Sequence, residues 1–75
     1  MREEVLRELL EEEEEARRVR EESANWEYIK ELPPRLRIAL EIFIKTGDLW
    51  RAAKFAEMKL EEFDELRRRA GVVNA

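Results

Sequence analysis

Only four of the 75 residues are glycine or proline, and this scarcity most constrains the fold. Pro33 and Pro34 are adjacent and disfavour helical geometry at Leu32, so one element should end there. Gly47 and Gly71 each follow a stretch with helical spacing, where a left-handed residue commonly ends a helix. No stretch alternates apolar and polar residues for long enough to predict a strand. The chain is therefore predicted to be all-α, with its helices separated at these positions.

The first predicted helix covers residues 2–23 and carries one apolar stripe. Its apolar residues recur at three- and four-residue steps, as on one face of a helix; they are Val5, Leu6, Leu9, Leu10, Ala16 and Val19. Five consecutive glutamates, Glu11 to Glu15, interrupt the stripe. We expect both ends of this helix to touch apolar surface while its centre stays in water. The residues leave open whether the helix packs on the rest of the chain or projects from it as an arm.

The segments after this helix predict a more compact unit. A short aromatic segment that contains Trp26 ends at the two prolines. Residues 35–46 then carry apolar side chains around most of a helix circumference, which predicts burial on more than one side. Asp48 is expected to cap a third helix, and a fourth should run from about residue 60 to residue 70.

The predicted organisation is a long N-terminal helix plus three short helices, of which the last two form a helix-turn-helix-like corner. Residues 1–32 form an acidic N-terminal helical arm with a short aromatic segment, and residues 33–75 form a compact helix-turn-helix-like domain. Before residue 33, 6 basic and 12 acidic residues give a net charge of −6; from residue 33 onward, 9 basic and 7 acidic residues give +2. An acidic arm repels nucleic acid and anionic membranes.

The chain contains neither cysteine nor histidine. This excludes disulfides, thiolate zinc sites, cysteine nucleophiles and acid-base catalysis by histidine. The run of glutamates does not suit a metal ion either, because consecutive helical carboxylates point around the whole circumference and cannot converge. We therefore expect no enzymatic activity, no cofactor and no metal site.

Composition also bears on source and location. Glutamate supplies 17 of the 19 acidic residues and arginine 11 of the 15 basic ones. Because this bias is common in proteins of hot-living organisms, we expect a thermophilic source. No apolar run approaches the ~20 residues that a membrane span needs, and no short apolar stretch typical of a signal peptide follows Met1. We expect a soluble, cytoplasmic protein that does not bind membranes.

Residues 51–71 have the spacing of a helix-turn-helix. Ala53 stands where the two helices of such a motif cross closely, and the turn follows four residues later at Glu57. Such turns usually contain glycine, because a non-glycine residue at positive φ costs about 1 kcal/mol or more. The spacing therefore predicts a tight turn with an unfavourable residue in it.

A DNA-binding version of this motif would use three basic residues: Arg51, Lys54 and Lys59. The second helix, however, would turn three carboxylates toward DNA: Glu61, Asp64 and Glu65. These oppose the attraction to phosphates that supplies most DNA affinity. We keep a DNA-binding transcription regulator as an alternative and do not expect nucleic acid as the main partner.

Several short segments of the C-terminal half carry a resemblance to a known family. They are Ala39-Leu-Glu-Ile-Phe-Ile-Lys-Thr-Gly47, Ala52-Ala-Lys-Phe-Ala56, Met58, Glu62-Phe-Asp-Glu-Leu66 and Gly71-Val72. Over residues 36–73 the chain resembles the C-terminal half of small archaeal and bacterial antitoxins of the VapB type, which pair with PIN-domain ribonuclease toxins. The chain departs from that family by Glu57 in place of a turn glycine, by a loop after Gly47 that is one residue shorter, and by an acidic N-terminal helix in place of a DNA-binding arm.

The resemblance implies an antitoxin-like protein that neutralises a partner ribonuclease toxin by direct contact. A PIN-type nuclease holds its metal with carboxylates, and guanidinium groups pair with carboxylates in a rigid fork. The implied candidates for that contact are Arg67, Arg68 and Arg69. The alternative is that these arginines end the last helix and pair with Asp64 and Glu65.

Further candidates for partner contact are apolar. Trp50 belongs to a residue type enriched at interfaces, although packing in the core or at its edge is the preferred explanation for both Trp50 and Trp26. Val72 and Val73 follow the last helix and form an apolar tail that docks on a partner or on the chain's own core. A helical oligomerisation module, for example a homodimer, is the remaining alternative.

Overall fold

The computed structural model describes residues 2–75 and contains five helices. They are α1 (Glu3–Ser23), α2 (Trp26–Lys30), α3 (Pro34–Thr46), α4 (Leu49–Ala56) and α5 (Leu60–Arg69). The prediction of an all-α fold with a long first helix is confirmed. The aromatic segment before the prolines is itself a short helix, α2, whose N-cap Asn25 accepts a hydrogen bond from the backbone N–H of Tyr28 at 3.2 Å.

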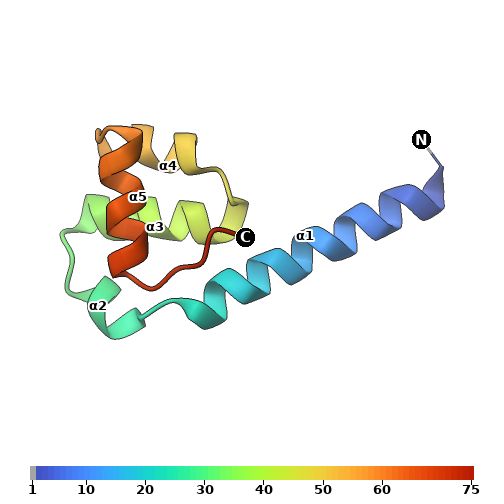
Figure 1. Ribbon diagram of the computed structural model, residues 1–75, viewed down its shortest axis with the longest axis horizontal. Coiled ribbons are helices and arrows are strands. Elements are labelled where there is room, and N and C mark those ends of the chain that lie inside the picture. The colour runs from blue at the N-terminus through green and yellow to red at the C-terminus, as the bar shows by residue number, and fades with distance from the viewer. Residues whose placement is uncertain (1) are drawn as a thin grey trace.

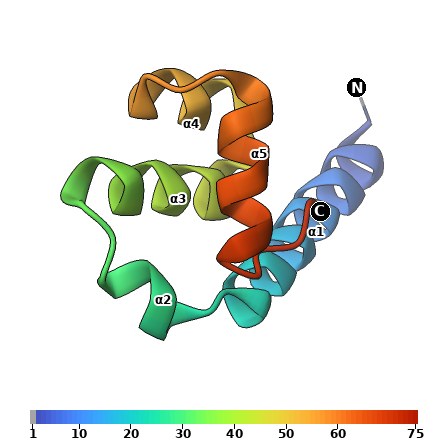
Figure 2. The ribbon, with the colours of Figure 1, turned by 60° about the vertical axis from the view of Figure 1, so that its left-hand side comes forward.

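The long helix α1 extends well beyond the rest of the molecule, as Figures 1 and 2 show. Its last turns contact the end of α3, and its first thirteen residues, 3–15, are all exposed. We call residues 3–15 the projecting segment. The expectation that both ends of this helix touch apolar surface is therefore wrong for the N-terminal end.

Helix α3 forms the centre of the compact unit and packs against α1, α2 and α4. This arrangement explains why its apolar residues surround most of its circumference. The rings of Phe43 and Phe63 meet edge to face, with centroids 6.5 Å apart, which joins α3 to α5. The buried apolar core comprises Ile29, Ala39, Leu40, Phe43, Ile44, Ala52, Ala53, Ala56, Phe63, Leu66, Ala70 and Val72.

The helix ends lie where the sequence predicts them. Gly47 ends α3 at φ 71°, and Gly71 follows α5 at φ 76°. Asp48 caps α4 by accepting a hydrogen bond from the Arg51 backbone N–H at 3.0 Å. The predicted tight turn between α4 and α5 is present, and Glu57 adopts the unfavourable left-handed conformation at φ 58°. Small side chains at Ala52 and Ala53, both almost fully buried, let α4 approach its neighbours closely.

Among the helices of residues 2–75, none combines the length and the apolar character that crossing a bilayer requires.

Candidate protein-binding surfaces

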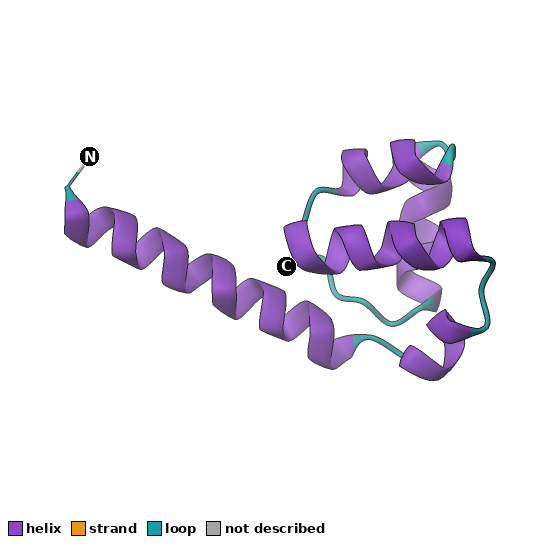
Figure 3. Ribbon diagram, turned by 180° about the vertical axis from the view of Figure 1, so that it is seen from behind, coloured by secondary structure: helices purple, strands orange, loops and turns teal. Residues whose placement is uncertain are grey.

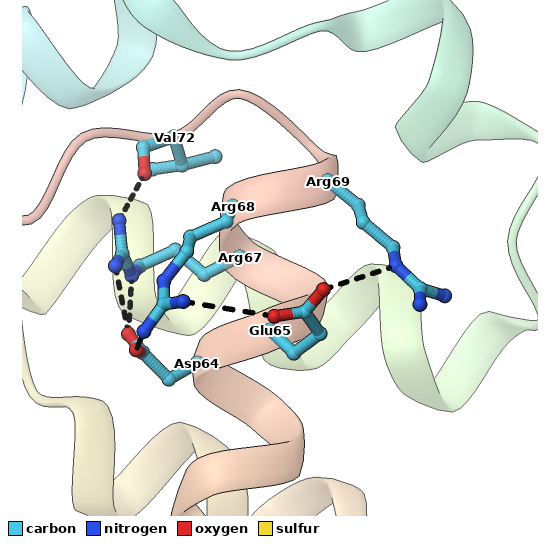
Figure 4. A network of polar contacts seen from close by, with 6 residues as sticks. All are labelled: Asp64, Glu65, Arg67, Arg68, Arg69 and Val72. Carbon is cyan, nitrogen blue, oxygen red and sulfur yellow. Dashed lines mark hydrogen bonds and ion pairs between the residues drawn. The ribbon is translucent and has the colours of Figure 1, made fainter.

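The three arginines at the end of α5 do not form one surface, as Figure 4 shows. Arg67 turns inward and is only 9% exposed. Its Nε donates a hydrogen bond to Asp64 Oδ1 at 2.8 Å, and its Nη1 donates to the backbone carbonyl of Val72 at 2.7 Å. The expectation that Arg67 contacts a partner is corrected by this burial, because its guanidinium is already occupied in joining α5 to the segment that follows.

Arg68 and Arg69 lie on the outside of α5 and pair with carboxylates of the same helix. Arg68 Nη2 lies 2.6 Å from Asp64 Oδ2, and Arg69 Nε lies 3.5 Å from Glu65 Oε1. This arrangement agrees with the alternative prediction that these arginines end the last helix and pair with Asp64 and Glu65. The hydrogen bonds from Arg67, and then from Arg68, hold the pKa of Asp64 below its ordinary value. Both outer arginines remain about two-thirds exposed.

The chain after α5 folds back onto its own core. Val72 is 1% exposed, so the expectation that it contacts a partner is corrected: it docks on the chain's own core, which was one of the two outcomes left open. Val73 keeps 39% of its surface exposed, and its backbone N–H donates to Ser23 Oγ at 3.1 Å. The backbone N–H of Asn25 donates to the Ala70 carbonyl at 2.8 Å. These contacts fasten the end of α1 to the segment after α5.

Arg20 is a structural residue that the sequence did not single out. It is 3% exposed, its Nε donates to the Ile44 carbonyl at 2.8 Å, and its guanidinium lies 5.9 Å from the centre of the Phe43 ring. Burial lowers the pKa of this guanidinium, which remains protonated at neutral pH. Arg20 also lies close to Gly47: a Cβ at position 47, already strained by its φ of 71°, would lie 3.0 Å from Arg20 Nη1. A signal was available: Arg20 lies four residues after Ala16, on the face of the apolar stripe.

The projecting segment presents apolar side chains to water. We call the four apolar residues near its tip the N-terminal stripe: Val5, Leu6, Leu9 and Leu10. Their exposed fractions lie between 44% and 53%. Eight glutamates and one arginine between residues 3 and 15 give the same segment a net charge of −7. The stripe lies on the face that farther along carries Ala16 and Arg20, so it continues the surface with which α1 docks on its own domain.

A second exposed surface is an open groove between α4 and the start of α5. We call it the α4–α5 groove; its principal lining residues are Trp50, Arg51, Lys54, Met58, Lys59 and Leu60. Trp50 is 73% exposed, so packing at the edge of the core does not explain it. The groove also gathers the three basic residues that the DNA-binding alternative named. Trp50, in α4, therefore lies with these cations near the start of α5. Arg67, Arg68 and Arg69 lie at the other end of α5, in its last turn.

The acidic side chains of residues 2–75 do not gather into a group of three or more that could hold a metal ion. Comparisons of the chain with models of known protein families, with curated proteins and with solved structures find no match. Among residues 2–75, two surfaces combine exposed apolar side chains with an excess of one charge. These are the N-terminal stripe in its acidic surroundings and the α4–α5 groove with its three cations.

Proposed function

We propose that the chain is a protein-binding regulator of the antitoxin kind, which neutralises a partner ribonuclease by direct contact through the projecting segment. The observation that carries the proposal is the N-terminal stripe, about half exposed on a helix that leaves its own domain. Exposed apolar side chains arranged on one face of a helix are the usual anchors by which a helix binds in the groove of another protein.

The charge of the projecting segment favours a particular kind of partner. A ribonuclease must attract phosphates, so its substrate-binding surface carries positive charge. A segment with a net charge of −7 complements such a surface, and its stripe supplies apolar contact that RNA lacks. The segment would thus compete with RNA for the same surface. The resemblance of residues 36–73 to VapB-type antitoxins supports the choice of a ribonuclease.

The three arginines at the end of α5 therefore contribute less to partner binding in this proposal than the resemblance implies. Arg68 and Arg69 remain exposed and lie in the last turn of α5, and they are available for a secondary contact. Arg67 is excluded from the proposed contact because it is buried and paired. The proposal therefore assigns binding to α1 and leaves the end of α5 with a supporting role.

DNA binding by the corner of α4 and α5 is the second candidate. The observation that favours it is that Arg51, Lys54 and Lys59 line one groove. Such binding would weaken steeply with added salt, because phosphate contacts release counterions. Binding of a ribonuclease through the apolar stripe should keep a substantial part of its affinity in the same salt.

The test is co-purification of the full-length chain with the protein encoded beside it, followed by an RNA-cleavage assay on that protein with and without the chain. We expect a stable complex in which cleavage is suppressed. The double variant Leu6→Gln/Leu9→Gln should lose this suppression, because it removes apolar surface and keeps both charge and helix propensity. The control variant Glu4→Gln/Glu11→Gln changes the opposite face of the same helix and should keep most of it.

Two results would overturn the proposal. One is the absence of any complex between the two proteins at micromolar concentration. The other is a complex whose inhibition is unchanged by Leu6→Gln/Leu9→Gln, since the projecting segment would then not be the binding element.

A further inference from the structure

The α4–α5 groove has the composition of a binding surface. Trp50, with 73% of its surface exposed, is the most exposed large apolar residue among residues 2–75, and Met58 and Leu60 line the same groove. A tryptophan this exposed is unusual, because its large ring is buried on average. Arg51, Lys54 and Lys59 line the same groove as these apolar side chains. An occupant of the groove should therefore be apolar on one side and acidic around it.

The same molecule carries a segment with that chemistry. The projecting segment has a net charge of −7 and bears the N-terminal stripe on one face. The one carboxylate that lines the groove, Asp48, already accepts a hydrogen bond from the backbone N–H of Arg51. The three cations of the groove thus face no lining carboxylate other than this capping residue. Cations predominate beside the apolar residues of the groove, and glutamates predominate beside the N-terminal stripe, where Arg7 is the one basic residue.

A chain cannot place its projecting segment in its own groove in this arrangement. The C-terminal end of α1 is held by the bond from Arg20 to the Ile44 carbonyl and by the bond from Val73 to Ser23. From that point α1 runs away from the domain, whereas α4 and the start of α5 lie at the opposite edge, as Figures 1 and 3 show. The projecting segment that fits the groove must come from another molecule.

Pairing of two projecting segments with each other is disfavoured by their charge. Side by side, two such helices would bring together two segments that each carry a net charge of −7. Like charges at short range oppose association, while opposite charges at a groove favour it. Charge complementarity therefore selects the groove over a second projecting segment.

We propose that the projecting segment of one copy of this chain docks, through its N-terminal stripe, in the α4–α5 groove of a second copy. Leu6 and Leu9 contact Trp50, and the surrounding glutamates face Arg51, Lys54 and Lys59. The contact joins two different surfaces, so it is of the head-to-tail kind that generates rings or open chains. It involves about two turns of helix, and such a small interface gives weak, concentration-dependent association.

This inference goes beyond the proposed function, because it concerns the chain without any other protein. The two proposed contacts exclude each other, because the groove of a second copy and a ribonuclease would compete for the same N-terminal stripe. Substitutions in the groove would then release the projecting segment for the ribonuclease, whereas substitutions in the stripe would impair both contacts. Failure of one proposal therefore leaves the other open to its own test.

The experiment is sedimentation velocity on the full chain alone, from micromolar to millimolar concentrations. We expect association that grows with concentration and weakens with added salt. A stripe variant, Leu6→Gln/Leu9→Gln, and a groove variant, Trp50→Ala/Lys54→Glu, should each weaken it by about tenfold or more, since apolar anchors and central aromatics dominate such contacts. Trp26→Ala serves as the matched control and should associate like the original chain. Circular dichroism verifies that each variant is folded.

The decisive arm of the experiment mixes the two defective variants. The stripe variant keeps an intact groove and the groove variant keeps an intact stripe, so the mixture should form a one-to-one dimer that neither variant forms alone. A mixture that stays monomeric would overturn the proposal. So would a groove variant that still associates normally, which would indicate pairing between projecting segments, or an original chain that stays monomeric at millimolar concentration.

Discussion

Replacing Arg67 by methionine tests whether this arginine is a structural residue. Methionine retains much of the buried aliphatic volume and removes the guanidinium. The side chains of Arg67 and Asp64 are 11% and 20% exposed, so the groups left behind are largely shielded from water. The substitution therefore separates the polar contribution of Arg67 from its packing.

The expected loss follows from the two groups that Arg67 contacts. The Val72 carbonyl loses a buried donor that lies 2.7 Å away, and an unsatisfied buried acceptor costs about 1–3 kcal/mol. Asp64 loses a charge-assisted bond but keeps Arg68 as a partner, which adds roughly 1 kcal/mol. The sum is about 2–4 kcal/mol, against about 4–11 kcal/mol for the whole stability of a chain of this size.

The assay is urea unfolding followed by circular dichroism, with thermal melts in parallel. A loss of this size lowers the melting temperature by roughly 8–32 °C. The matched control is Arg69→Met, whose side chain is 67% exposed and whose loss should change stability by only about 0.5 kcal/mol. If Arg67→Met costs less than about 1 kcal/mol and resembles Arg69→Met, the buried network does not contribute to stability as reasoned.

Three further predictions concern other contacts. Arg67 and Arg68 depress the pKa of Asp64. The stabilisation from this carboxylate is therefore complete above the ordinary aspartate pKa of about 3.9 and is lost as pH falls through the lower folded-state value. Asp64→Asn should flatten the acid part of a profile of unfolding free energy measured between about pH 5 and pH 2. Arg20→Met should lower the free energy of unfolding in urea by about 1–3 kcal/mol, because the Ile44 carbonyl loses its donor. Glu57→Gly should raise the melting temperature and add about 0.5–1 kcal/mol, because relief of the positive φ exceeds the entropy that glycine adds to the unfolded chain.

The helix boundaries could be predicted because their causes are local. A proline pair, two glycines and the capping residue Asp48 act on their immediate neighbours, so their effect can be read without the tertiary structure. The turn at Glu57 was predicted in the same way, from the spacing of small and apolar residues around it. Only the short helix α2 was missed, and it has a local cap, Asn25, that could have indicated it.

The candidate surfaces were less predictable because burial depends on distant segments. Arg67 and Arg69 belong to the same run of three arginines. Only Arg67 donates a hydrogen bond to the Val72 carbonyl, after the chain turns back at Gly71. Packing at the edge of the core was the preferred prediction for Trp50, and its exposure of 73% shows that this prediction was wrong. The gathering of Arg51, Lys54 and Lys59 in the same groove follows from the corner of α4 and α5.

The projecting segment has a consequence for the energetics of any complex it enters. Its thirteen residues, 3–15, are all exposed and so gain little packing from the domain, and isolated helices of about 12–15 residues are marginal in water. We therefore expect the segment to be in a helix–coil equilibrium, in which helix population declines from the anchored end at Ala16 toward Glu3. A partner binds only the helical fraction, so the apparent dissociation constant is the intrinsic one divided by that fraction. Substitutions that raise helix propensity on the face opposite the N-terminal stripe would tighten binding without adding a single contact.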